Sequence, residues 1–132
     1  MNKNVLITGS TSGIGLGIAE AFAKNGDNIV FNGLEENGAA IVAEIGTKYG
    51  VKTAFKNSNL MTPEGVQELV DFAYSELSSV DILVNNAGIQ FVSKIEDFPL
   101  EKYQQIIALN MNVVFYASRV VFKKMKEQKS GR

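Results

Sequence analysis

The sequence predicts an α/β protein whose doubly wound parallel sheet lies between two layers of helices. Three observations predict this three-layer fold. A glycine-rich segment, residues 8–15, directly follows an apolar run at residues 5–7. Short apolar segments then alternate with amphipathic ones, as in βαβ units. A further apolar run, residues 81–84, lacks the alternation of a half-exposed strand and is typical of a strand covered on both faces.

The first half of the chain is predicted to contain three strands, at residues 5–7, 28–32 and 51–55. A helix follows the glycine-rich segment and ends at Gly26, and a second helix ends at Gly50. Three apolar side chains recur at i, i+4 and i+8 on the expected buried face of the first helix: Ile14, Ile18 and Phe22. We therefore expect this helix to pack on the sheet through large apolar residues.

In the second half, Thr62 is the predicted N-cap of a helix that has Pro63 at its first position. A fourth strand at 81–84, a loop at 89–99 and a long helix at about 100–126 follow. The apolar stripe of the long helix comprises Ile106, Ile107, Val113, Val114, Ala117, Val121 and Met125. A doubly wound sheet of this kind is expected to have the strand order 3-2-1-4, and the chain length predicts one domain spanning residues 1–132.

Composition limits the possible functions. The 132 residues are 45% hydrophobic and 20% charged, with a net charge of −1, which gives no electrostatic footprint for nucleic acid. The absence of cysteine and histidine excludes disulfides and removes the commonest general base and zinc ligand, so no metal site is expected. The first strand leaves no room for a signal peptide, and no apolar stretch is predicted to span a bilayer, so we expect a cytoplasmic protein without membrane contact.

The glycine-rich segment predicts a phosphate-binding loop. Gly9, Gly13 and Gly15 allow a sharp turn and a close approach of the backbone, and the following helix directs its free N–H groups at an anion. Because the spacing is Gly-x-x-x-Gly-x-Gly and no lysine follows, a dinucleotide is expected rather than a nucleotide that is hydrolysed. The alternative is that these glycines form only a turn and a helix cap.

The strand at 81–84 ends in a segment of polar and small residues, Asn85-Asn86-Ala87-Gly88. In doubly wound folds, ligands bind at the carboxyl ends of the strands, where such residues can reach a cofactor. The alternative is that Asn85 and Asn86 only cap backbone groups in a tight turn.

Together these motifs resemble the short-chain dehydrogenase/reductase family over the whole chain, with Thr8, Asp81 and Asn110 at further positions where that family keeps polar residues. The resemblance implies a Rossmann-type fold and a nicotinamide dinucleotide cofactor. It also implies a set of cofactor-binding residues: Gly9, Thr11, Ser12, Gly13, Ile14, Gly15, Asn86, Ala87 and Gly88. It assigns Asn110 to catalysis, where the residue helps to hold water in a proton relay. The alternative for Asn110 is a buried amide that packs in the core.

Charge favours NAD over NADP as the cofactor. A 2′-phosphate needs a basic partner, yet residues 4–23 and 25–47 contain no lysine or arginine. Glu35 and Glu36 would repel a phosphate, although a solvated surface position is the simpler expectation for both. Leu34 is expected to pack on the adenosine half of the cofactor. Asn59 and Leu60 resemble the family's Asp-Leu pair at the adenine.

Within the family, residues 85–90 and 95–99 most resemble (R)-3-hydroxybutyrate dehydrogenases, in which a glutamine binds the substrate carboxylate. By position this residue is Gln90, although Phe91 departs from the pattern and an exposed loop position is the alternative. The resemblance implies oxidation of this small hydroxy acid to the keto acid, acetoacetate. The alternatives are a 3-oxoacyl reductase, another small-alcohol dehydrogenase, or a non-catalytic NAD-binding or interaction module.

Members of the family also need a serine and a Tyr-x-x-x-Lys pair for catalysis. The tyrosines at 49, 74, 103 and 116 are followed four positions later by Thr53, Ser78, Ile107 and Val120. The chain therefore resembles the N-terminal part of an enzyme, inactive alone, whose parent is expected to be a homo-oligomer, a tetramer. Because of an unpaired sheet edge at residues 82–84 and the long helix, the chain is expected either to self-associate or to be poorly soluble alone.

Overall fold

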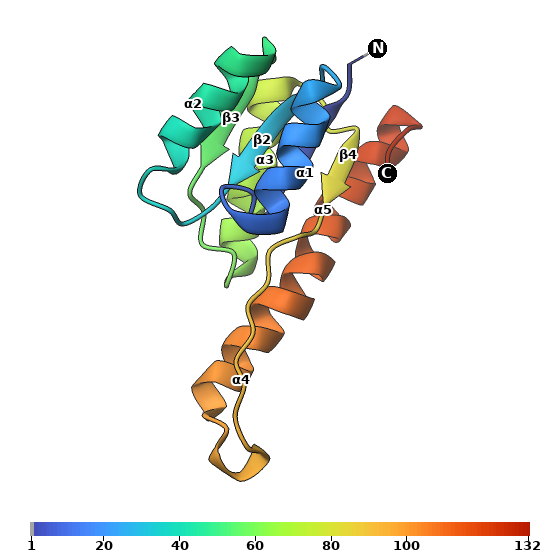
Figure 1. Ribbon diagram of the computed structural model, residues 1–132. Coiled ribbons are helices and arrows are strands. Elements are labelled where there is room, and N and C mark those ends of the chain that lie inside the picture. Colours follow the sequence, from blue (N-terminus) through green and yellow to red (C-terminus); the bar gives the residue numbers. More distant parts are fainter. Residues whose placement is uncertain (1) are drawn as a thin grey trace.

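The computed structural model describes residues 2–132 and contains a four-stranded parallel sheet (Figure 1). Its strands are β1 (Asn4–Ile7), β2 (Asn28–Asn32), β3 (Thr53–Lys56) and β4 (Ile82–Val84). They are arranged in the order β3-β2-β1-β4, and every pairing is parallel. The predicted strand order is confirmed.

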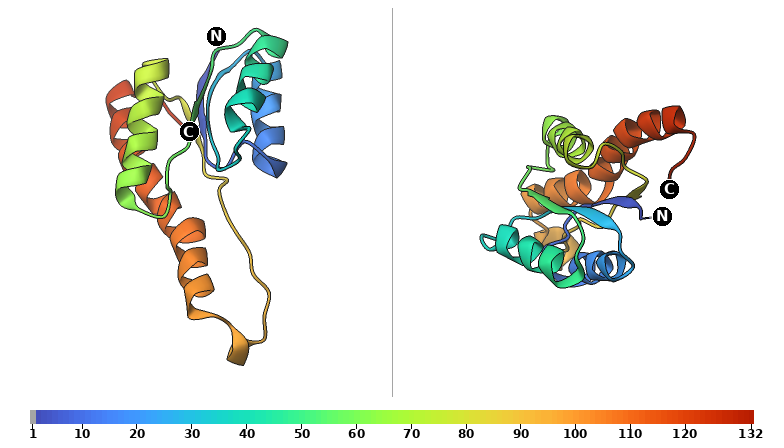
Figure 2. Two further views of the ribbon diagram at one scale, coloured as in Figure 1. Left: turned by 90° about the vertical axis from the view of Figure 1, so that its left-hand side faces the viewer. Right: turned by 90° about the horizontal axis from the view of Figure 1, so that it is seen from above.

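Helices cover both faces of the sheet (Figure 2). On one face lie α1 (Gly13–Lys24) and α2 (Gly38–Tyr49), and on the other lie α3 (Pro63–Leu77) and α5 (Val113–Gln128). Residues of β1 alternate between the two cores: Val5 and Ile7 pack with α1 and α2, whereas Leu6 packs with α3 and α5. Burial on both faces explains why the strands have apolar side chains on both sides.

The buried face of α1 differs from the predicted one. Its buried residues are Gly15, Ala19 and Ala23, whereas Ile14 is 79% exposed. Ile18 and Phe22 pack only at the margin of the core. Small side chains bring the helix close to the sheet, and this places the larger side chains of the predicted stripe outside the closest contact.

The ends of α2 and α3 follow the sequence signals. Thr62 caps α3, since its hydroxyl oxygen accepts a hydrogen bond from the Gly65 N–H at 3.1 Å. Gly50 ends α2 in the left-handed conformation. The predicted start of the third strand at Val51 is too early, because the Val51 N–H still caps α2 by donating to the Gly46 carbonyl oxygen at 3.2 Å.

The predicted long helix contains an interruption. After a loop with a 3₁₀ turn, η1 (Ile95–Asp97), the helical run comprises α4 (Leu100–Ile107), a π-helical segment η2 (Ala108–Asn112) and α5. In Figure 1, α4 and its preceding loop extend away from the three layers. Three stripe residues of α5 are buried: Val113, Ala117 and Val121.

A second side of this helical run is apolar and exposed; we call it the apolar side, and it comprises Met111, Val114, Phe115 and Phe122. By length and composition alone, Leu100–Gln128 meets the criterion for a membrane-spanning helix, so the expectation that no stretch is long enough was wrong. Core helices of soluble proteins, which are mostly buried, meet the same criterion, whereas 17% of the apolar window of this helix is buried.

The outer edge of β4 is partly paired, whereas an unpaired edge was expected. The Leu83 N–H donates to the carbonyl oxygen of Arg132, and the Arg132 N–H donates to that of Asp81, both at 2.9 Å. Arg132 therefore lies beside β4 as a further strand would, and part of the edge is paired.

Candidate functional site

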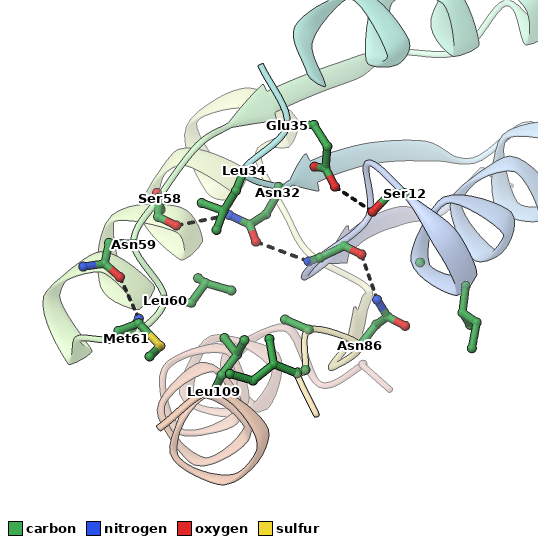
Figure 3. Close-up of a pocket in the computed structure, with 17 residues that line it drawn as sticks. Ser12, Asn32, Leu34, Glu35, Ser58, Asn59, Leu60, Met61, Asn86 and Leu109 are labelled. Atoms are coloured by element: carbon green, nitrogen blue, oxygen red, sulfur yellow. Dashed lines mark hydrogen bonds between the residues drawn. The ribbon is translucent and has the colours of Figure 1, made fainter. Parts of the chain in front are cut away.

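The carboxyl ends of the strands surround a pocket of about 480 Å³ (Figure 3). This is the edge at which doubly wound sheets bind their ligands. The lining residues come from the glycine-rich segment, from the end of β2, from the segments after β2, β3 and β4, and from η2: Gly9, Ser12, Ile14, Gly15, Asn32, Gly33, Leu34, Glu35, Ser58, Asn59, Leu60, Met61, Asn86, Ala87, Gly88, Ile89 and Leu109.

The glycine-rich loop has no room for side chains at two positions. Gly9 has φ +60°, and a Cβ there would lie 2.9 Å from the Cα of Ala87. At Gly15, a Cβ would overlap the carbonyl oxygen of Gly9 and the side-chain amide of Asn86. The loop therefore requires glycine to turn into α1 directly beside the segment after β4.

Thr8 and Asn86 fasten this loop to the end of β4. The Thr8 hydroxyl oxygen accepts hydrogen bonds from the backbone N–H groups of Asn86 and Ala87, both at 3.0 Å. In return, the Asn86 side chain donates to the carbonyl oxygens of Thr8 and Gly9, at 3.1 and 2.8 Å. Asn86 therefore binds backbone groups, as expected if it caps a turn, and it also lines the pocket. Asn85 instead donates to the Ser118 hydroxyl at 3.3 Å.

Glu35 bridges the segment after β2 and the glycine-rich loop. Its carboxylate accepts hydrogen bonds from the Ser12 hydroxyl, at 2.6 Å, and from the Thr11 hydroxyl. These bonds, that of Ser12 first, lower the pKa of the Glu35 carboxyl below its usual value, so the group is ionised at neutral pH. The expectation of a merely solvated Glu35 was wrong. Glu35 is the one ionisable side chain among the lining residues found within 2–132.

Apolar and amide groups form the rest of that end of the pocket. Leu34 is 77% exposed at its rim, and Leu60 is buried. The Asn59 side-chain oxygen accepts a hydrogen bond from the Met61 N–H at 3.0 Å, which leaves the Asn59 amide N–H groups for a ligand. The hydroxyl of Ser58 is buried and has no hydrogen-bond partner among residues 2–132.

Asn110 lies in the π-helical segment and is exposed rather than buried in the core. Its side-chain oxygen accepts from the Ile89 N–H at 2.9 Å, and its amide donates to the Ile89 carbonyl oxygen at 2.8 Å. Both side-chain groups therefore hold the loop after β4, and one N–H and one oxygen lone pair of the amide are not used by these two bonds. π-Helical segments are frequent at functional sites.

The structure brings most of the predicted residues to one place. Ten of them line the pocket: Gly9, Ser12, Ile14, Gly15, Leu34, Asn59, Leu60, Asn86, Ala87 and Gly88. Four predicted residues do not line it, namely Thr11, Gly13, Gln90 and Asn110. Thr11 is buried against Glu35, whereas Gln90 lies exposed in the loop after β4.

Asn32 is a site residue that no sequence motif indicated. Asn32 ends β2, is 2% exposed and lines the pocket. Its position at the carboxyl end of a strand beside the predicted crevice was the available signal. Within residues 2–132, no group of three or more carboxylates gathers to hold a metal ion.

Sequence comparison finds one family over nearly the whole chain. The sequence model of the family described as short chain dehydrogenase matches residues 3–132. A D-beta-hydroxybutyrate dehydrogenase from Cupriavidus necator is 41% identical over 130 residues, which are 98% of this chain and 50% of that protein. The enzyme of the same name from Rhizobium meliloti is 39% identical over 100% of this chain and 52% of its own length.

Comparison of structures gives the same fold. L-Sorbose reductase from Gluconobacter frateurii, solved with NADPH and L-sorbose, superposes with a TM-score of 0.92 at 34% identity, over 99% of this chain and 51% of that one. The chain spans about half the length of the curated relatives it matches.

Proposed function

Because the chain belongs to the short-chain dehydrogenase family, we propose that its pocket binds NAD. We further propose that an enzyme containing this chain interconverts (R)-3-hydroxybutyrate and acetoacetate. The observation that carries the choice of cofactor is the Glu35 carboxylate, which the hydroxyls of Ser12 and Thr11 hold at the pocket.

The pocket suits a dinucleotide in shape. Gly9 and Gly15 have no side chains, so the glycine-rich loop can turn tightly at the start of α1. This geometry suits a pyrophosphate bound at the N-terminus of the helix. Leu34 and Leu60 offer apolar surface for an adenosine, and the free amide of Asn59 offers donors for its base. When bound, the nicotinamide accepts or delivers a hydride.

Glu35 favours NAD for two reasons. An ionised carboxylate can accept hydrogen bonds from the hydroxyls of an unmodified ribose. A 2′-phosphate carries a charge of about −1.5 to −2 at neutral pH and would meet the like charge of the Glu35 carboxylate, which opposes its binding. The phosphate would also compete for the Ser12 and Thr11 hydroxyls that Glu35 already uses. No lysine or arginine lies within residues 4–23 or 25–47 to offset this repulsion.

The substrate proposal rests on the relatives and on Gln90. Two relatives that cover nearly the whole chain are D-beta-hydroxybutyrate dehydrogenases. Gln90 directly follows Ile89, which lines the pocket, and its amide can donate to a substrate carboxylate. Asn110 holds the backbone of Ile89 through both of its side-chain groups and so fixes the start of this loop.

Titration calorimetry of the chain with NAD and with NADP tests the cofactor. We expect NAD to bind more tightly, because its ribose carries no charge against Glu35. Equal or tighter binding of NADP would contradict the proposal.

Measurement of turnover tests the proposed reaction. The 132-residue chain contains no Tyr-x-x-x-Lys pair, and general acid–base catalysis is worth about 10²–10⁴ in rate. We expect no NADH formation from (R)-3-hydroxybutyrate with the chain alone, and activity in an enzyme in which the chain is continued by such a pair. Preference of that enzyme for a 3-oxoacyl thioester would instead favour the reductase alternative.

A further inference from the structure

Asn32, the last residue of β2, uses all of its polar groups. Its backbone N–H donates to the Ser10 hydroxyl oxygen at 3.0 Å, and its carbonyl oxygen accepts from the Ser10 N–H at 2.7 Å. Its side-chain oxygen accepts from the Gly9 N–H at 3.2 Å, and its side-chain amide donates to the Lys56 carbonyl oxygen at 3.1 Å. Asn32 therefore joins the glycine-rich loop to the ends of β2 and β3.

The peptide groups of Gly9 are held from two sides, by the side chains of Asn32 and Asn86, which are labelled in Figure 3. Asn32 accepts from the Gly9 N–H, and Asn86 donates to the Gly9 carbonyl oxygen at 2.8 Å. Asn86 belongs to the segment after β4, whereas Asn32 belongs to β2 on the other side of β1. The two amides together fix the point at which the loop leaves β1.

The partners of Asn32 require one acceptor and one donor on the same side chain. The Gly9 N–H needs an acceptor, and the carbonyl oxygens of Lys56 and Ser58, the latter at 3.5 Å, need a donor. A neutral amide satisfies both, whereas an ionised carboxylate would set a negative oxygen against a carbonyl oxygen. In a site that is 2% exposed, water cannot screen this repulsion effectively.

We propose that Asn32 is a positioning residue of the cofactor site, and that its function requires an amide. It acts through Gly9 and Ser10, whose placement sets where the loop turns toward α1. This inference rests on the proposed binding of NAD, since its effect is read as the affinity for that cofactor.

The same strand offers a matched control at its other end. The Asn28 side-chain amide donates to the Asn4 side-chain oxygen at 3.0 Å, and its oxygen accepts from the Lys52 N–H at 3.1 Å. Asn28 thus bridges β1 and the segment before β3 in the same way, at the amino ends of the strands. Asn28→Asp creates the same kind of electrostatic conflict at a half-buried position away from the pocket.

The experiment compares wild type, Asn32→Asp and Asn28→Asp by calorimetry with NAD, below the unfolding temperature of each. We expect Asn32→Asp to weaken binding about tenfold or more, as for loss of a buried hydrogen-bonded pair. We expect Asn28→Asp to keep the wild-type affinity although it also loses stability. Hydrogen exchange without cofactor should speed up at Gly9 and Ser10 in Asn32→Asp only.

The outcomes separate the two proposals. If wild type binds NAD and Asn32→Asp binds it equally well, the positioning role is wrong and the proposed function stands. If both aspartate variants weaken binding alike, Asn32 is merely structural and the inference is again wrong. If wild type does not bind NAD, the proposed function fails, and the exchange at Gly9 and Ser10 decides whether Asn32 positions the loop. Should Asn32→Asp not fold, Asn32→Ala, which removes the side-chain bonds to Gly9 and Lys56 without adding a charge, takes its place in each comparison, with Asn28→Ala as its control.

Discussion

The Glu35 carboxylate accepts hydrogen bonds from two hydroxyls that lie 23 and 24 residues earlier in the chain. Because such partners are not visible in a local pattern, Glu35 could not be distinguished from Glu36 by sequence alone. The glycines are different, because their spacing alone predicts a close backbone approach, and the positions of Gly9 and Gly15 agree with it.

At the residue scale, Leu34→Arg should narrow the difference in affinity between NAD and NADP by about tenfold, because a guanidinium at the rim gives the 2′-phosphate a charged donor. Calorimetry with both cofactors measures it. Asn37→Arg adds the same charge to the same connection at a residue that does not line the pocket. An equal gain in both variants would show that net charge, rather than a contact, is responsible.

The elements of the fold could be predicted where the signal is local. The bounds of β2, the end of α2 at Gly50 and the cap of α3 at Thr62 agree with the sequence patterns. The buried face of α1 could not be predicted, because apolar periodicity weights side-chain size and the helix packs through glycine and alanine. Nor did any pattern mark the π-helical segment, since an extra residue in a turn leaves the composition unchanged.

At the scale of elements, Ala19→Leu should destabilise the protein by about 1–3 kcal/mol, because Ala19 is fully buried where α1 meets the sheet. The exposed Ile14 provides the contrast: Ile14→Ala should change the free energy of unfolding by about 0.5 kcal/mol or less. Urea unfolding of both variants measures these changes. A larger loss of stability for Ile14→Ala than for Ala19→Leu would instead show that α1 packs through the large apolar residues expected from periodicity.

At the scale of the whole molecule, helices cover both faces of the sheet, but one side of the helical run Leu100–Gln128 is exposed to solvent. Its apolar side, Met111, Val114, Phe115 and Phe122, is solvent-exposed, and exposed apolar patches of this kind mark interaction sites. The sequence could predict that this helix is apolar, but not which side stays uncovered. The pairing of Arg132 with β4 leaves less unpaired backbone for association than was expected.

We predict that the chain self-associates through the apolar side. Light scattering over a concentration series should give a mass that rises with concentration, and Phe115→Glu should lower it, since a charge opposes burial of this surface. Lys123→Glu also adds negative charge on α5, outside the apolar side, and should leave the mass unchanged. A monomeric wild-type protein at high concentration would contradict this prediction.

The selection of NAD by the Glu35 carboxylate is tested most directly by calorimetry of wild type and Glu35→Gln with NAD and with NADP. The account predicts that wild type prefers NAD and that the variant gains affinity for NADP by about tenfold or more, because the like charge is removed. Glu36→Gln, an exposed neighbour that does not line the pocket, should keep the wild-type ratio of affinities. An unchanged ratio in Glu35→Gln would contradict the account.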